Sequence, residues 1–211
     1  MSIMEIQNVQ YAYDGKKKVL RDINAQMEQG KMYAILGPSG CGKTTLLSLL
    51  GGLDSPSSGQ ILYQGEDISK TGLDNHRRSH VAFIFQSYNL IDYLTPMENV
   101  ALTSKLPTLP ILEQLGLTAE EAKRNVLKLS GGQQQRVAIA RALASDAQVI
   151  LADEPTGNLD EDTAAEISTI LKDSAHKSGK CVVIVTHSNK LAKEADVVFQ
   201  LTKGVLKLFK L

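Results

Sequence analysis

The stretch Gly37-Pro38-Ser39-Gly40-Cys41-Gly42-Lys43-Thr44 decides how the rest of this chain is interpreted. It fits the pattern G-x-x-x-x-G-K-[ST], follows an apolar run over residues 32–36 and opens a segment, 44–50, with a helical pattern. Glycines let backbone NH groups converge on phosphate oxygens, and a helix start adds positive dipole and unpaired donors. A glycine-rich turn could match by chance, but the strand before it and the helix after it favour a phosphate-binding loop. Lys43 would then reach the β- and γ-phosphates of a nucleotide, and the Thr44 hydroxyl would ligate Mg²⁺.

Composition places the chain among globular proteins, and its length is sufficient for one α/β domain with a small subdomain. Of 211 residues, 43% are hydrophobic and 22% charged, and 23 Lys and Arg balance 23 Asp and Glu. This balance argues against nucleic acid as a partner, because proteins that bind it usually carry a one-sided basic field. The apolar runs are far shorter than the roughly 18 residues needed to cross a bilayer, and no signal peptide precedes the first expected strand. We therefore expect a cytosolic protein.

Two kinds of strand are expected from the apolar pattern. Residues 3–9 and 19–27 alternate apolar and polar positions, which indicates antiparallel strands, and a further hairpin is expected over 60–68. Residues 32–36, 81–85, 149–152 and 181–186 are continuous apolar runs, typical of parallel strands covered on both faces. The fold class is therefore predicted to be α/β, with a mostly parallel sheet flanked by helices and an antiparallel β subdomain.

The region between Gln86 and Ser130 has a different character. Thr95-Pro96-Met97-Glu98 and Thr118-Ala119-Glu120-Glu121 both fit capping boxes that open helices, the first with proline in the first helical position. Residues 103–110 hold two prolines and are expected to be a connector. We predict a small helical subdomain over 87–129, with residues 1–86 and 130–211 forming the core and the antiparallel β subdomain.

Two further segments carry candidate chemistry. The apolar run over 149–152 ends in Asp153 and Glu154; beside a phosphate loop, Asp153 could hold Mg²⁺ and Glu154 could polarise an attacking water, although a solvated acidic turn is the ordinary alternative. Ser130 with its following glycines precedes an apolar-periodic segment over 137–143. Ser130 is thus either a second anion site at a helix start or only the N-cap of a surface helix.

Taken together, these residues identify a family. The chain resembles the ATP-binding subunit of ABC transporters over essentially its whole length, and five motifs occur in the order of that family. They are GPSGCGKT (37–44), FQ (85–86), LSGGQQQR (129–136), ILADEPTGNLD (150–160) and VTH (185–187). The resemblance implies a P-loop NTPase core of the RecA type, ATP and Mg²⁺ as cofactors, and ATP hydrolysis as the activity.

The resemblance also implies a role for individual residues. Catalysis would involve Glu154, His187, Gln86 and Lys43, and the metal would be held by Thr44, Gln86 and Asp153. Nucleotide would be bound by Tyr13, Gly37, Pro38, Ser39, Gly40, Cys41, Gly42, Lys43, Thr44, Thr45, Ser130, Gly131, Gly132, Gln133 and Asp160. Tyr13 would stack on adenine, with Tyr11 as a competing candidate. Asp160 would cross a dimer interface; read without the family, it is a helix cap.

The partners follow from the same resemblance. ATP would be sandwiched in a head-to-tail homodimer in which Ser130–Gln133 act on the nucleotide of the other subunit, and the dimer would drive an integral-membrane permease from the inner face of the cell membrane. The chain most resembles the bacterial subgroup of lipoprotein-release, macrolide-export, antimicrobial-peptide-resistance and cell-division ATPases. A shortened stretch over 100–116 departs from that subgroup. A soluble ATP-driven clamp and a regulatory cassette without hydrolysis are the alternatives.

Overall fold

The computed structural model describes residues 2–13, 18–157 and 159–209, and these fold around two β-sheets. The four-stranded antiparallel sheet has the order β2-β1-β4-β5, and the six-stranded sheet the order β10-β9-β3-β8-β7-β6. The strands of the first are β1 (Ser2–Ala12), β2 (Lys18–Glu28), β4 (Ser58–Tyr63) and β5 (Glu66–Asp67). Those of the second are β3 (Met32–Leu36), β6 (Val81–Ile84), β7 (Val149–Asp153), β8 (Cys181–Thr186), β9 (Val197–Thr202) and β10 (Val205–Phe209).

The six-stranded sheet is parallel except at one edge. β6, β7, β8, β3 and β9 run in the same direction, whereas β10 pairs antiparallel with β9. Every residue of β3, β7 and β8 is buried, as their continuous apolar sequences predict. Because the strands are parallel, their carboxyl ends meet at one edge, and the loops after β3, β7 and β8 lie together there.

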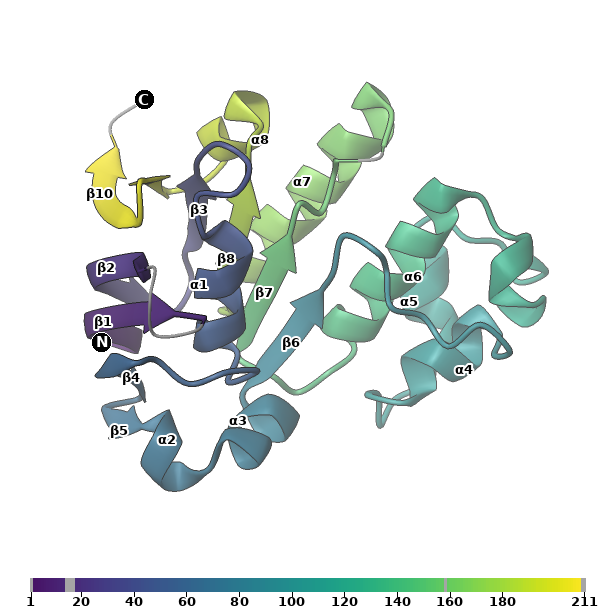
Figure 1. Ribbon diagram of the computed structural model, residues 1–211. Coiled ribbons are helices and arrows are strands. Elements are labelled where there is room, and N and C mark those ends of the chain that lie inside the picture. The colour runs from purple at the N-terminus through teal and green to yellow at the C-terminus, as the bar shows by residue number, and fades with distance from the viewer. Residues whose placement is uncertain (1, 14–17, 158, 210–211) are drawn as a thin grey trace.

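The helices surround this sheet and fill the stretch between β6 and β7 (Figure 1). They are α1 (Lys43–Leu50), α2 (Ile68–Thr71), α3 (Leu73–Ser79), α4 (Pro96–Ala101), α5 (Leu109–Gln114), α6 (Gly131–Leu143), α7 (Glu161–His176) and α8 (Asn189–Lys193). Two 3₁₀ turns, η1 (Glu121–Lys123) and η2 (Val126–Lys128), precede α6.

Two hydrophobic cores lie on opposite faces of the six-stranded sheet, because successive side chains of a strand alternate between faces. On one face Ile35 and Val183 pack with the leucines of α1 and with the antiparallel sheet. On the other, Ala34 and Val182 pack with α6, α7 and α8. Figure 1 shows α1 in front of the sheet and α7 and α8 behind it. The α/β fold class with an antiparallel sheet is thus confirmed.

The antiparallel strands occur where the alternating pattern predicted them. β1 pairs antiparallel with β2 and with β4, and β4 with β5, so the hairpin expected over 60–68 is also present. It is shorter than expected, since α2 already begins at Ile68. The Asp67 side chain ends the strand by accepting a hydrogen bond from the Ser69 NH at 3.0 Å.

The stretch from 87 to 129 contains only short helical elements among its residues, all of which are described. The capping box at Thr95 opens α4 as predicted. The box at Thr118 forms the same hydrogen bonds with Glu121, yet only the three-residue 3₁₀ turn η1 follows. The prediction of an α-helix opening at Thr118 is therefore wrong. Pro110 lies in the first turn of α5, which shortens the expected connector. The division at residues 86 and 130 stays a prediction.

Candidate functional site

The phosphate-loop motif forms a tight turn between β3 and α1. A Cβ on Gly37 would lie 2.4 Å from the Leu201 carbonyl oxygen, so only glycine fits there. Gly42, with φ of 104°, is the N-cap of α1, a backbone conformation that favours glycine. Pro38, Ser39 and Gly40 form the exposed crest of the loop. The NH groups at the start of α1 therefore have no side-chain cap and are available to an anion.

Lys43 connects this loop to the end of β7. Its side chain is buried, and Nζ donates to the carbonyl oxygens of Gly37 at 2.8 Å and Pro38 at 3.2 Å. Nζ also lies 3.9 Å from Oε1 of Glu154. The cation therefore stands between the phosphate loop and the carboxylate expected to activate water.

Glu154 sits at a strained turn directly after β7. Its φ of 45° lies in the left-handed region, which costs a non-glycine residue about 1–3 kcal/mol. Its NH donates to the Val185 carbonyl oxygen at 3.0 Å, and its own carbonyl accepts from the Gly157 NH at 3.1 Å. Backbone strain held in place by neighbouring hydrogen bonds is common where a side chain must be aimed at a reaction centre.

Two residues at the end of β8 hold the Glu154 carboxylate. Thr186 Oγ1 donates to Oε2 at 3.0 Å, and His187 Nδ1 lies 2.9 Å from Oε1. A carboxylate oxygen accepts, so His187 donates from Nδ1, and Nε2 of this exposed ring makes no hydrogen bond to any described residue. Glu154 is therefore fixed in direction while the histidine keeps one nitrogen for a further partner.

Asp153 and Thr44 bring two oxygen donors together beside the loop. Burial raises the pKa of Asp153 above its ordinary value, and the hydrogen bond from the Thr44 hydroxyl opposes that shift. The neighbouring Glu154 carboxylate raises the pKa further, and Lys43 lowers it. Hydroxyl and carboxylate oxygens suit Mg²⁺. The described residues contain no group of three or more His, Cys, Asp or Glu placed to bind a metal, so a cation here would need oxygens from a nucleotide as well.

Gln86 lies in the loop after β6, near Glu154. Gln86, Tyr88, Gln135, Glu154, Pro155 and Leu159 line one small cavity. The loop contains two consecutive left-handed residues, Tyr88 with φ of 62° and Asn89 with φ of 48°. Arg141 of α6 donates to both of their carbonyl oxygens, at 3.1 and 2.7 Å respectively.

Of the two tyrosines considered for adenine stacking, only Tyr13 is accessible. Its side chain is 67% exposed, whereas Tyr11 is 7% exposed and belongs to the core. The Tyr13 hydroxyl lies 2.8 Å from Oγ1 of Thr45, in the first turn of α1. The ring thus stands beside the phosphate-loop helix, with Tyr11 packed edge-on against it at 5.1 Å.

The remaining expected residues are not brought to the phosphate loop. Ser130 is the N-cap of α6 and forms a capping box with Gln133, and Asp160 is the N-cap of α7, accepting from the Thr163 NH at 2.9 Å. Within the described parts of the chain, no hydrogen bond or ion pair connects Ser130, Gly131, Gly132, Gln133 or Asp160 to residues 37–44. In Figure 1 the start of α6 lies in the helical region, apart from α1.

Three residues of this site were not predicted to act in it. Thr186 lies within the VTH motif (185–187) and holds the Glu154 carboxylate. Its hydroxyl at the end of a buried strand was the sequence feature that could have indicated this role. Gln135 and Arg141 lie on α6, and their contacts with residues 155 and 88–89 join positions far apart in the sequence. No local pattern marks such contacts.

Comparison with known proteins identifies relatives of the whole chain. The family model described as ABC transporter matches residues 20–157. The chain is 46% identical over 215 residues to an uncharacterised ABC transporter ATP-binding protein, YclH, of Bacillus subtilis, covering 97% of this chain and 95% of that protein. It is 41% identical to the macrolide export ATP-binding/permease protein MacB of Agrobacterium fabrum, with 92% of this chain matching 32% of that protein.

Solved structures agree with these relatives. The dimeric structure of MJ0796, described as a bacterial ABC transporter cassette, has 35% sequence identity and a TM-score of 0.89, covering 97% of this chain and 96% of that one. A dimeric post-hydrolysis state of the same cassette bound to ADP and Pi has 34% identity and a TM-score of 0.87, with 98% of both chains covered.

Proposed function

Because this chain belongs to the ABC transporter family of ATP-binding proteins, we propose that it is the ATPase subunit that powers a membrane permease, with the residues of the site described above in defined roles. The observation that carries this proposal is the Glu154 carboxylate, half-buried at a strained turn and held by Thr186 and His187 at a distance of 3.9 Å from Lys43. A fixed carboxylate next to a phosphate-binding loop suits a group that accepts a proton from an attacking water.

Each residue then has a separate task. The loop NH groups and Lys43 bind the phosphates of ATP, and Tyr13 stacks on its adenine. Glu154 orients the water and takes its proton, while His187 keeps the Glu154 oxygen in position and offers its free nitrogen to the γ-phosphate. Thr44, Asp153 and Gln86 supply the oxygens that would hold Mg²⁺, and the cation would neutralise developing phosphate charge.

A second copy of the chain completes the site. Ser130–Gln133 lie at the capped start of a 13-residue helix, on an exposed surface away from the phosphate loop of the same chain. In a head-to-tail homodimer this helix start faces the γ-phosphate bound by the other copy, and Asp160 lies at the same interface. The dimeric state of the MJ0796 cassette supports this arrangement. Hydrolysis removes the charge that joins the two copies, and the dimer opens.

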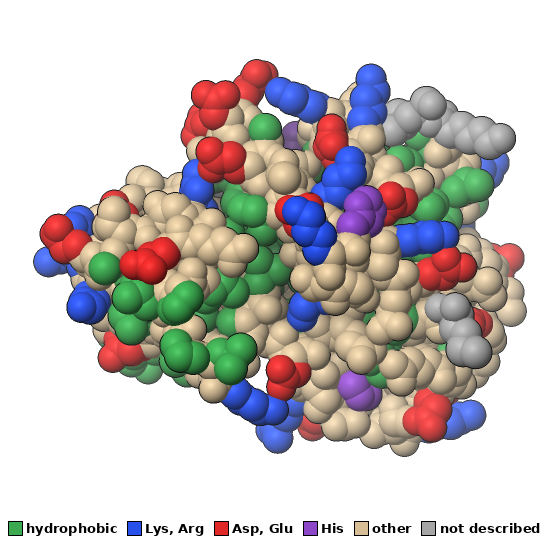
Figure 2. Space-filling view, turned by 180° about the vertical axis from the view of Figure 1, so that it is seen from behind, with side chains coloured by type: hydrophobic (Ala, Val, Ile, Leu, Met, Phe, Trp, Pro, Cys, Tyr) green, Lys and Arg blue, Asp and Glu red, His purple; other side chains and the backbone are tan. Residues whose placement is uncertain are grey.

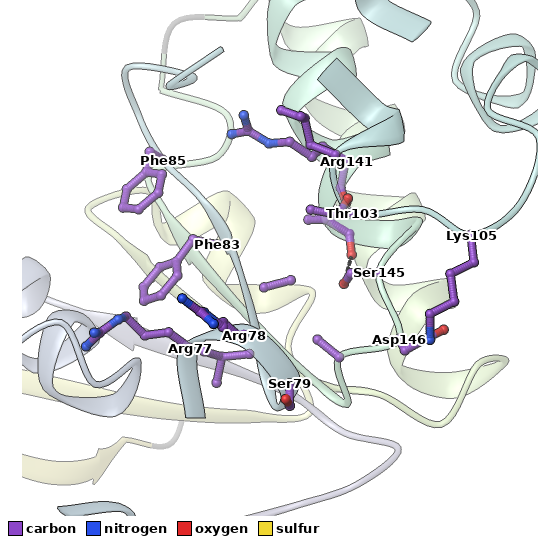
Figure 3. Close-up of a pocket in the computed structure, with 15 residues that line it drawn as sticks. Arg77, Arg78, Ser79, Phe83, Phe85, Thr103, Lys105, Arg141, Ser145 and Asp146 are labelled. Carbon is purple, nitrogen blue, oxygen red and sulfur yellow. Dashed lines mark hydrogen bonds and ion pairs between the residues drawn. The ribbon is translucent and has the colours of Figure 1, made fainter. Parts of the chain in front are cut away.

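In this proposal the permease binds in the cavity drawn in Figure 3, because the side chains that line the cavity suit such a partner. This cavity, of about 610 Å³, lies between α3, β6, the segment after α4, and α6. Phe83 and Phe85 form an apolar wall with parallel rings 5.0 Å apart. Arg78 and Arg141 add positive charge, whereas Lys105 is already paired with Asp146 at 2.7 Å. An apolar segment of the permease with acidic residues, at the cytoplasmic surface of the membrane, matches this lining. MacB, whose name joins an ATP-binding part to a permease, supports such a partner.

Surface composition agrees with a partner at this end of the molecule. Figure 2 shows hydrophobic side chains gathered over the helical region. Tyr93, Leu102, Leu106 and Leu127, all between β6 and α6, are among the exposed large hydrophobic side chains. In the described residues no helix is long and apolar enough to span a bilayer. We place the chain at the inner face of the cell membrane, held there by the permease, in the subgroup that includes macrolide exporters.

The test of this function is the pair Glu154→Gln and Lys43→Ala. Glu154→Gln keeps the shape of the side chain but removes the proton acceptor, so turnover should fall by about 10²- to 10⁴-fold while ATP now holds a stable dimer on gel filtration. Lys43→Ala should instead lose nucleotide binding. Glu113→Gln, an exposed glutamate in α5, is the matched control. Unchanged turnover in Glu154→Gln would remove that residue from its role, whereas ATP binding without turnover in the wild-type chain would favour a regulatory cassette.

A further inference from the structure

The side chain of Gln135 is buried between α6 and the turn that follows Glu154. It is 2% exposed, and its Nε2 donates to the Pro155 carbonyl oxygen at 2.9 Å. Pro155 follows the strained residue Glu154 directly. Gln135 therefore connects the helix that begins with Ser130 to the backbone next to the catalytic carboxylate.

This hydrogen bond fixes which way the amide points. A backbone carbonyl oxygen only accepts, so the Gln135 atom that faces Pro155 must be the nitrogen. The other atom, Oε1, is buried, and no donor in the described residues lies within hydrogen-bonding distance of it. A buried amide oxygen without a donor is unfavourable, since buried polar groups are nearly always hydrogen-bonded. Gln135 is thus prepared to accept one more hydrogen bond.

Gln86 is the residue placed to donate it. Gln86 and Gln135 line the same small cavity beside Glu154, and this cavity is too narrow to hold a water molecule. A direct contact between side chains therefore fits better than a water bridge. Gln86 is exposed and makes no hydrogen bond to any described residue, so its amide is free to turn toward α6. The loop that carries it follows the wall of the permease cavity, since Phe85 precedes Gln86.

We propose that Gln135 is a positioning residue whose Oε1 accepts a hydrogen bond from the Gln86 amide and so holds Gln86 beside Glu154 during hydrolysis. The inference rests on the proposed ATPase site, and it adds a residue to that site. Closing this bond satisfies the buried oxygen, and it ties the loop after β6 to α6 and, through Pro155, to the turn at Glu154. Movement at the permease cavity can then change the geometry at Glu154 by breaking one hydrogen bond.

A double-mutant cycle tests this contact in the full chain. ATP turnover is measured for wild type, Gln86→Ala, Gln135→Met and the double variant, with kcat and KM for ATP determined separately. If Gln86 acts through Gln135, the effect of Gln86→Ala on kcat should be smaller in the Gln135→Met background by about fivefold or more, while KM stays within about twofold. A role of Gln135 in packing alone would leave the two effects multiplicative.

The control is the neighbouring glutamine. Gln134, also on α6, donates to the Leu129 carbonyl oxygen at 3.0 Å and does not line the cavity. The effects of Gln134→Met and Gln86→Ala on kcat should therefore multiply, as expected of independent residues. If thermal unfolding shows that Gln135→Met does not fold, Gln135→Asn, which keeps a shorter amide, replaces it in the cycle. The proposal is overturned if the effects of Gln86→Ala and Gln135→Met on kcat multiply to within about twofold in the double variant. Full turnover in Glu154→Gln would instead refute the ATPase site itself.

Discussion

Replacing Arg141 with lysine should loosen the loop that carries Gln86 without unfolding the protein. The guanidinium donates from Nη1 to the Asn89 carbonyl oxygen at 2.7 Å and from Nη2 to the Tyr88 carbonyl oxygen at 3.1 Å. A lysine ammonium has one nitrogen and lacks the planar fork that reaches both oxygens. The variant keeps the charge and most of the stem, so the change removes little besides one of the two bonds.

The expected magnitude follows from the exposure of these bonds and the strain of the loop. A hydrogen bond from a charged donor contributes about 1.5–3 kcal/mol, and we discount this to about 1–2 kcal/mol because the Arg141 contacts are partly open to solvent. The left-handed conformations of Tyr88 and Asn89 already cost the loop free energy. At about 1.4 kcal/mol for each factor of ten, the ordered loop should lose about five- to thirtyfold of its population relative to open forms.

Hydrogen exchange of the peptide covering residues 86–90 measures this population. Exchange should become about five- to thirtyfold faster in Arg141→Lys, because opening by local unfolding sets the rate. ATP turnover should fall by no more than the same factor, with little change in the thermal midpoint. Arg136→Lys is the matched control, since Arg136 lies on the same helix but contacts the Leu115 carbonyl oxygen and Glu166. Equal exchange over residues 86–90 in Arg141→Lys and wild type would refute the reasoning.

Three further predictions concern other parts of the chain. Burial lowers the pKa of His76, so the folded protein holds it neutral while the unfolded chain takes up a proton below about pH 6.5. Stability is therefore lost as the pH falls, and His76→Gln should reduce the drop in thermal midpoint between about pH 7.5 and 5.5. An identical drop in the variant and the wild type would contradict this. Burial raises the pKa of the Cys181 thiol to about 12. In the folded protein, iodoacetamide near pH 8 should therefore alkylate the half-buried Cys41 at least about tenfold faster than Cys181, as followed by mass spectrometry. Equal rates for the two cysteines would show that Cys181 is accessible. Tyr13→Ala should weaken ATP affinity about two- to tenfold by fluorescence titration, whereas Tyr13→Phe should retain it; full affinity in Tyr13→Ala would exclude stacking.

Local signals predicted the ends of elements better than their lengths. The capping boxes at Thr95 and Thr118 form equivalent hydrogen bonds, yet one opens the helix α4 and the other only a 3₁₀ turn. A cap satisfies the first NH groups of a helix, but continuation depends on burying an apolar face. After Ala122 the chain continues with Lys123, Arg124 and Asn125, which offer no such face.

The C-terminal segment forms the element that its local sequence pattern favours. In residues 205–211, Lys207 and Lys210 stand among apolar residues, a pattern that favours an edge strand over contact with a membrane surface. β10 pairs along its length with β9 at the edge of the six-stranded sheet, which agrees with the strand. Lys210 and Leu211 lie outside the described residues, as does Asn158 of the motif over 150–160.

The sequence by itself determined the phosphate loop, the buried strands, the capped start of α6 and the acidic pair after β7, because each depends on residues adjacent in the chain. Only the tertiary structure decided what holds Glu154. Thr186 ends β8 and His187 follows it, Lys43 comes from α1, and the turn is held by Gln135 from α6. These contacts cross strands and helices far apart in sequence, and they form only when the two cores pack on opposite faces of the sheet.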